Sequence, residues 1–238
     1  LPILASDGYD ITLNDTRDYD VDYTLEPVTE ESYAEYVWPE KHPAAGQPIM
    51  LRDYQVEVIN GFLSNPQSLQ EVATGAGKTL ITAVLSHRCE QHGRTVIIVP
   101  NKSLVTQTEA DYVNMGLDVG VYYGDRKEFG KTHTICTWQS LNILLKNTKN
   151  ASAEVTIGEF LEGVVCIMVD EVHMAKADAL KTLLTGVMSH IPIRWGLTGT
   201  VPKEDFESVS IVCSLGPVTN KISAKELQDK GVLAQCNV

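Results

Sequence analysis

Hydrophobic residues recur along the chain in short runs of strand length, separated by stretches with the spacing of amphipathic helices. The apolar runs cover residues 69–72, 95–99, 119–123, 132–136, 164–169, 193–197 and 209–213, and helical spacing is found at 79–92, 103–114 and 177–190. Strands that are apolar throughout are typical of a sheet covered on both faces. The pattern therefore predicts an α/β domain with a doubly wound, mainly parallel sheet and helices on both faces. Ligands bind such sheets at the carboxyl ends of the strands.

The first 48 residues follow a different pattern. Polar and apolar residues alternate up to Trp38, with a short helical stretch expected near residues 30–37. Three prolines and one glycine between residues 39 and 48 predict a linker. We therefore expect a small N-terminal appendage, an acidic accessory segment with its linker at 1–48, followed by the main domain at 49–238.

Charge is distributed unevenly along the 238 residues. The net charge is −12, yet residues 1–40 hold eleven acidic residues and one base, Arg17. The other 198 residues hold twenty acidic residues and eighteen bases, so the main domain is nearly neutral. Any contact that it makes with nucleic acid must therefore be local rather than driven by bulk charge.

The spacing of cysteines and the length of apolar runs indicate the cellular compartment. The five cysteines contain no Cys-x-x-Cys pair, which favours neither a zinc site nor a disulfide framework. No run reaches the roughly 18 apolar residues of a membrane span, and no signal segment opens the chain. We expect a cytoplasmic protein without a membrane partner, and Leu1 in place of Met suggests a fragment.

A glycine-rich turn between the run at 69–72 and the following helix carries the strongest chemical signal. Its small residues allow backbone N–H groups to approach phosphates, its lysine adds positive charge, and its last hydroxyl suits Mg²⁺. The residues expected to bind nucleotide are Thr74, Gly75, Ala76, Gly77, Lys78 and Thr79. The general P-loop pattern places glycine where this chain has Val72. A turn that only joins strand to helix is the alternative.

Two acidic residues follow the strand predicted at 164–169. In a parallel sheet this end lies near the phosphate loop, so Asp170 would hold Mg²⁺ with Thr79, and Glu171 would polarise the attacking water. A solvated turn is the alternative. His173 has three interpretations: a metal ligand, a core histidine, or a residue coupling ATP to nucleic acid.

The order of these segments resembles the DExH branch of the superfamily 2 helicases, over residues 49–238. Segment 51–55 is similar to the adenine-recognising segment of that family, which implies base contacts for Arg52 and Gln55. Segments 97–107 and 137–141 resemble those that contact the nucleic-acid backbone, which implies contacts by Pro100, Gln107, Thr137 and Gln139. Segment 197–200 resembles the coupling segment, which implies that role for Thr198 and Thr200, with His173 as a candidate partner in coupling. Within the family the likeness is closest to phage branch-migration helicases of the UvsW type.

The resemblance implies a RecA-like motor domain that uses ATP and Mg²⁺ to remodel DNA, with DNA a better candidate track than RNA. In this family a second RecA-like domain supplies arginine fingers, and the sequence shows no such segment. Arg194 is the only arginine after Glu171 and is poorly placed. We therefore expect weak or absent hydrolysis by this chain alone. The alternatives are a motor subunit of a restriction-enzyme translocase and a non-enzymatic nucleotide-binding scaffold.

Overall fold

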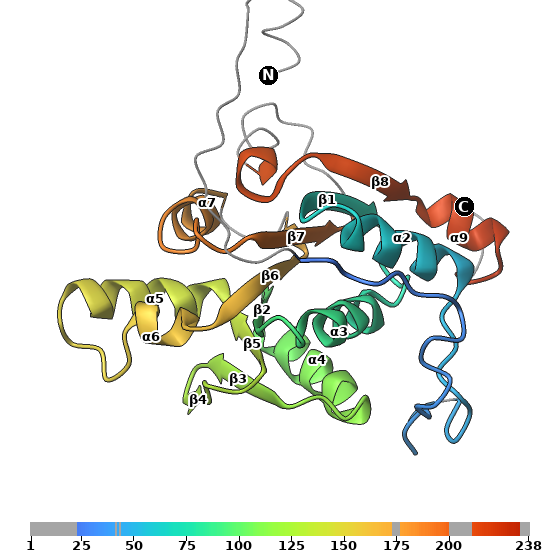
Figure 1. Cartoon of the computed structure of the whole chain (residues 1–238), viewed down its shortest axis with the longest axis horizontal. Coiled ribbons are helices and arrows are strands. Elements are labelled where there is room, and N and C mark those ends of the chain that lie inside the picture. The colour runs from blue at the N-terminus through green and yellow to red at the C-terminus, as the bar shows by residue number, and fades with distance from the viewer. Residues whose placement is uncertain (1–22, 41, 43, 173–176, 200–210, 234–238) are drawn as a thin grey trace, which may run out of the picture.

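A single eight-stranded sheet forms the centre of the computed structural model, which describes residues 23–40, 42, 44–172, 177–199 and 211–233 (Figure 1). The strand order is β4-β3-β5-β2-β6-β7-β1-β8, and every neighbouring pair is parallel except β3 with β4. The strands are β1 (Gln67–Val72), β2 (Arg94–Val99), β3 (Val119–Tyr123), β4 (Arg126–Lys127), β5 (His133–Thr137), β6 (Val164–Asp170), β7 (Ile193–Thr198) and β8 (Val218–Ile222).

Helices cover both faces of this sheet (Figure 1). One face carries α2 (Asp53–Leu63), α3 (Lys78–Cys89), α4 (Lys102–Asn114) and α9 (Ala224–Asp229); the other carries α5 (Trp138–Lys149), α6 (Ile157–Leu161) and α7 (Ala177–Thr185). Neighbouring residues of β2 enter opposite cores, since Ile97 packs with the first group and Ile98 with the second. The predicted doubly wound α/β fold is confirmed.

Two predicted elements differ from the structure. Residues 211–213 of the expected strand 209–213 belong to a helical segment that covers 211–215, and residues 209–210 lie outside the described part. Neither β4 nor β8 was predicted: β4 has only two residues, and β8 lies at the exposed edge of the sheet, which suits its polar sequence Val-Thr-Asn-Lys-Ile. Residues 30–36 form successive turns with bonds such as Ala34 N–H to Glu31 O, not the expected helix.

The end of the N-terminal segment packs against the main domain. Asn60 of α2 accepts a hydrogen bond from the Val28 N–H at 2.8 Å and donates to the Val28 carbonyl at 2.9 Å. Tyr33 is buried in the same core as α2 and α3. The domain boundary at residue 48 stays a prediction. Across the described chain, none of the helices has both the length and the apolarity required to cross a bilayer.

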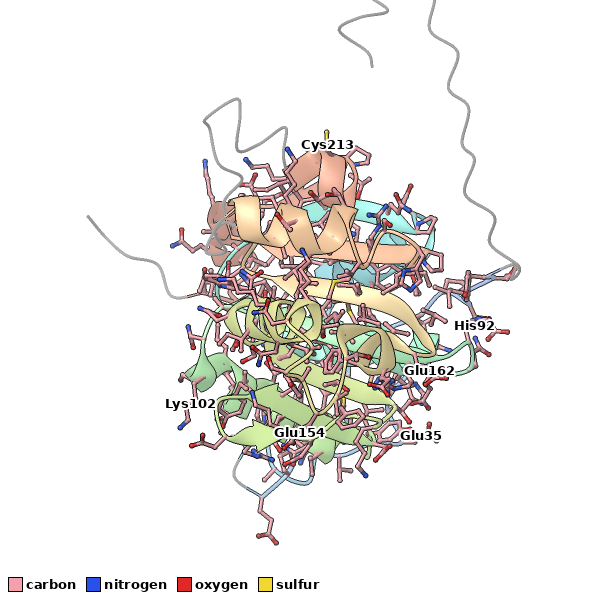
Figure 2. The ribbon with its side chains drawn as sticks, turned by 90° about the vertical axis from the view of Figure 1, so that its left-hand side faces the viewer. Glu35, His92, Lys102, Glu154, Glu162 and Cys213 are labelled. Carbon is pink, nitrogen blue, oxygen red and sulfur yellow. The ribbon has the colours of Figure 1, made fainter. Side chains whose placement is uncertain are left out.

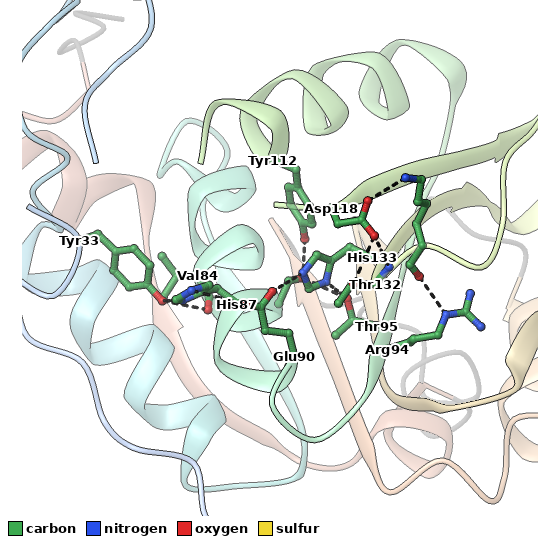
Figure 3. A network of polar contacts seen from close by, with 12 residues as sticks. Tyr33, Val84, His87, Glu90, Arg94, Thr95, Tyr112, Asp118, Thr132 and His133 are labelled. Carbon is green, nitrogen blue, oxygen red and sulfur yellow. Dashed lines mark hydrogen bonds and ion pairs between the residues drawn. The ribbon is translucent and has the colours of Figure 1, made fainter. Parts of the chain in front are cut away.

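A buried polar network connects α3 and α4 to the amino ends of β2 and β5 (Figure 3). His133 is fully buried, with Nδ1 at 2.7 Å from the Thr95 hydroxyl and Nε2 at 3.0 Å from a Glu90 carboxylate oxygen. The hydroxyls of Ser86 and Tyr112 lie 2.8 Å apart in the same network. Satisfied networks of this kind fix the packing of helices on a sheet.

Four cysteines lie in the described part of the chain, and they divide by burial. Cys89, Cys136 and Cys166 are buried, whereas Cys213 is exposed and projects from the surface in Figure 2. Burial raises the pKa of the Cys136 thiol, which lowers its nucleophilicity.

Candidate nucleotide site at the carboxyl edge of the sheet

The strands β6, β7 and β1 are neighbours and run parallel, so their carboxyl ends lie side by side at one edge of the sheet. Because β7 lies between β6 and β1, the segment after β7 lies between the glycine-rich loop and the acidic pair. Gly199 occupies that position: a Cβ added to it would lie 3.1 Å from the Thr74 hydroxyl and 3.8 Å from both Glu171 Oε2 and Lys78 Nζ. Parallel topology therefore brings together segments more than 90 residues apart in sequence.

The loop before α3 takes the backbone shape that its glycines permit. Gly75 and Gly77 have φ values of 85° and 77°, a region that side chains disfavour. Gly77 is also the N-cap of α3, so the helix begins at Lys78 and its free N–H groups face the loop. A helix end of this kind attracts phosphate.

The start of α2 fixes the loop from the side. The Ala76 carbonyl accepts hydrogen bonds from the Tyr54 hydroxyl at 3.0 Å and from Gln55 Nε2 at 3.1 Å. A Cβ on Gly77 would lie only 2.7 Å from Gln55 Nε2. Glycine at position 77 is thus required by both its dihedral angle and its neighbour.

Lys78 spans the gap to the acidic pair. Its amine forms an ion pair with the Glu171 carboxylate and donates to the Val72 carbonyl at 3.4 Å. The other Glu171 oxygen accepts from the Gly199 N–H at 3.2 Å. Glu171 itself adopts φ 51°, an unusual value for a residue with a side chain, which indicates a backbone constrained by the site.

Asp170 is the most deeply buried carboxyl of the site. Burial raises its pKa to about 6, the Glu171 charge acts in the same direction, and Lys78 and the Glu171 N–H oppose them. A buried carboxylate of this kind favours a nearby cation. The donor set of the Asp170 carboxylate and the Thr79 hydroxyl consists of hard oxygen atoms, which are the ligands that Mg²⁺ prefers.

A cavity of about 350 Å³ opens beside the loop. Its lining includes Arg52 and Gln55 together with the glycine-rich loop. Gln55 is 5% exposed, and its Oε1 accepts from the Arg52 N–H at 3.0 Å while its Nε2 is held by the Ala76 carbonyl. The residue expected to read adenine is therefore bonded to the protein at both ends of its amide.

The sequence profile of the family described as "Type III restriction enzyme, res subunit" matches residues 48–203. The chain belongs to this family. Among curated proteins it is 22% identical to the ATP-dependent DNA helicase uvsW of Enterobacteria phage T4 over 196 residues, which is 78% of this chain and 36% of that protein. It is 27% identical to the DNA 3'-5' helicase XPB of Mycobacterium tuberculosis over 210 residues, 86% of this chain and 36% of the relative. The chain thus spans about a third of each relative.

Solved structures give the same fold. The bacteriophage T4 UvsW helicase matches with a TM-score of 0.65 and 18% identity, covering 92% of this chain and 75% of that one. The Hef helicase domain of Pyrococcus furiosus matches with a TM-score of 0.56 and 18% identity, covering 75% and 40%. The expected resemblance to superfamily 2 helicases and the RecA-like fold are confirmed.

Of the four predicted nucleic-acid contacts, three lie at the carboxyl ends of the neighbouring strands β2 and β5. Pro100 and Gln139 are neighbours, since Gln139 Nε2 donates to the Pro100 carbonyl at 3.4 Å, and Thr137 caps α5 beside them. Gln107 instead lines the cavity next to the phosphate loop. The structure brings the first three to one strand-end cluster, and their role stays a prediction.

The predicted coupling residues are only partly described. Thr198 is fully buried at the end of β7, next to Gly199. His173 and Thr200 lie outside the described residues.

Sequence reasoning missed four residues around the nucleotide site: Tyr54, whose hydroxyl bonds the loop, and Trp38, His42 and Asp111 of the cavity lining. The spacing of Gln107, Asp111 and Asn114 along one helix face was a usable signal.

Proposed function

We propose that this chain binds Mg-ATP and forms the first, ATP-hydrolysing motor domain of a DNA helicase or translocase. The observation that carries the proposal is the meeting of three strand ends at Gly199, within reach of Lys78 and Glu171. Glycine-rich loop, lysine and paired carboxylates are the groups that phosphoryl transfer needs.

Each residue of the site has a proposed role. The loop N–H groups and Lys78 bind the phosphates, and Arg52 and Gln55 contact the adenine. Thr79 and Asp170 hold Mg²⁺, which neutralises phosphate charge when bound. Lys78 must leave Glu171 to reach the phosphates, and Glu171 then orients the attacking water and takes its proton.

Full turnover needs an arginine from outside the described residues. Arg194 is buried at the amino end of β7, where it donates to Gln67 and to the Leu184 carbonyl, at the edge of the sheet opposite the site. An arginine finger can accelerate phosphoryl transfer by about a thousandfold or more. We propose that a second RecA-like domain supplies it, and that this chain alone turns over slowly.

DNA is the proposed track. The relatives uvsW and XPB carry the name DNA helicase, and the cluster at Pro100, Thr137 and Gln139 offers a hydroxyl and an amide for backbone contacts. Remodelling of branched DNA is the favoured role. The res-subunit family match favours a second candidate, a restriction-enzyme translocase motor. Cutting of DNA by the full-length protein after translocation would distinguish the two.

Glu171→Gln tests the hydrolytic role. We expect the variant to keep its affinity for Mg-ATP and to lose at least about 100-fold in the hydrolysis rate, because a neutral amide cannot take a proton from water. A single-turnover assay with protein in excess over labelled ATP detects slow rates. Glu154→Gln, an exposed carboxylate between α5 and α6 (Figure 2), is the matched control. Hydrolysis by Glu171→Gln at the unmodified rate would refute the assignment.

A further inference from the structure

The cavity beside the phosphate loop has a wall built by the N-terminal segment. Residues 36–38 pair with residues 47–49 and close a loop, with Ile49 N–H bonded to Tyr36 O at 2.8 Å and Trp38 N–H bonded to Gln47 O at 3.0 Å. Within this loop the rings of Trp38 and His42 stack with centroids 4.0 Å apart and planes inclined by 13°. Both side chains line the cavity.

A second part of the cavity lining comes from α4. Gln107, Asp111 and Asn114 lie on one face of this helix and line the same cavity. Asp111 provides the single carboxylate among the described lining residues. His42 lies close enough for its charge to lower the pKa of Asp111, although burial has the larger effect and raises it. Asp111 is thus a partly enclosed acidic group at the cavity, beside a histidine.

The Asp111 carboxylate can accept hydrogen bonds from a ligand in the cavity. Among the described residues no side chain donates a hydrogen bond to the Asp111 carboxylate. Gln55, by contrast, has its oxygen bonded to Arg52 N–H and its nitrogen bonded to Ala76 O. Asp111 is therefore the strongest acceptor in the cavity to which no described side chain donates. An ionised carboxylate accepts hydrogen bonds and donates none.

This chemistry discriminates between purines. Adenine carries an amino group at position 6, which donates, whereas hypoxanthine and guanine carry an oxygen there, which accepts. A carboxylate facing position 6 binds adenine and repels hypoxanthine and guanine. We propose that Asp111, held beside His42, is a specificity-determining residue that selects 6-amino purine nucleotides. The proposal rests on the proposed nucleotide site and adds a base-reading residue to it.

Paired titrations of Mg-ADP and Mg-IDP test the proposal, because the two nucleotides differ only at the 6-position edge of the base. We expect the unmodified chain to prefer ADP and Asp111→Asn to reduce that preference at least about tenfold, the size of one hydrogen bond to a charged group. Asp125→Asn, an exposed residue of the turn between β3 and β4, makes the same chemical change away from the cavity and should keep the preference.

The outcomes separate this proposal from the proposed function. If Asp111→Asn, folded by thermal unfolding, keeps the ADP preference of the unmodified chain, the proposal is overturned while nucleotide binding stands. It is also overturned if the variant loses affinity for ADP and IDP equally, since the carboxylate would then only shape the cavity. A third contradicting result is that the variant loses its preference for Mg-ADP over Mg-dADP instead, since the carboxylate would then contact the ribose. If the unmodified chain binds neither ADP nor IDP, the proposed function itself fails.

Discussion

Gly75 and Gly77 have positive φ angles, and Lys78 at the start of α3 forms an ion pair with Glu171. These residues could be predicted because phosphate chemistry demands particular residue types at fixed spacing. The hydrogen bonds of Tyr54 and Gln55 to Ala76 could not, since they depend on how α2 packs beside the loop. The same holds for Asp111, whose proposed role requires α4 and the N-terminal segment to meet at one cavity.

His133 makes stability depend on pH. Burial is the main cause of its lowered pKa, and the Glu90 carboxylate opposes that effect. In the unfolded chain histidine has a pKa near 6.5, so below that pH the unfolded state binds a proton more readily than the folded state does. The free energy of unfolding therefore falls as the pH drops from about 6.5 through the lower pKa of the folded state.

Urea unfolding between pH 8 and pH 5 measures this dependence. We expect the free energy of unfolding of His133→Gln to fall less steeply over that range than that of the unmodified chain. His190→Gln, at an exposed position, should retain the original slope. Equal slopes for the unmodified chain and His133→Gln would rule out the explanation.

Helices and strands were predictable where burial and periodicity agree. All six apolar runs from 69–72 to 193–197 correspond to strands, because a buried parallel strand must be apolar on both faces. The run at 209–213 has the same composition but is helical from residue 211, since short apolar runs do not distinguish strand from helix. The polar edge strand β8 and the caps of α5 and α6 depend on local hydrogen bonds rather than on hydrophobicity.

The start of α5 has a structural role and a proposed functional role. Thr137 caps the helix by accepting from the Ser140 N–H, and it lies in the strand-end cluster proposed to hold DNA. We expect Thr137→Ala to lower the free energy of unfolding by about 1 kcal/mol through loss of the cap. We also expect it to weaken binding of labelled DNA.

Thr156→Ala provides the control, because Thr156 caps α6 in the same way by accepting from Glu159 N–H. It should cause a similar loss of stability with unchanged DNA affinity. If the two variants weaken DNA binding equally, Thr137 has no specific role in that contact.

At the scale of the whole molecule, the sheet order determines which segments can act together. Placing β7 between β6 and β1 joins the loop, Gly199 and Glu171 into one site, and the stacked pair Trp38 and His42 extends that site to the N-terminal segment. Sequence composition predicted a linker at residues 39–48, whereas the structure places part of it in the cavity wall. Prolines and glycines predict irregular backbone, but they do not predict which cavity that backbone lines.

Titration calorimetry of Mg-ATP binding to the unmodified chain and to Lys78→Ala tests whether the glycine-rich loop binds nucleotide. We expect saturable, Mg²⁺-dependent binding whose affinity falls at least about tenfold in Lys78→Ala, because a charge-assisted contact to phosphate is lost. Lys221→Ala, which removes an exposed ion pair with Glu71 at the edge of the sheet, should bind as the unmodified chain does. Equal affinity of the folded Lys78→Ala variant and the unmodified chain would contradict the assignment of the nucleotide site.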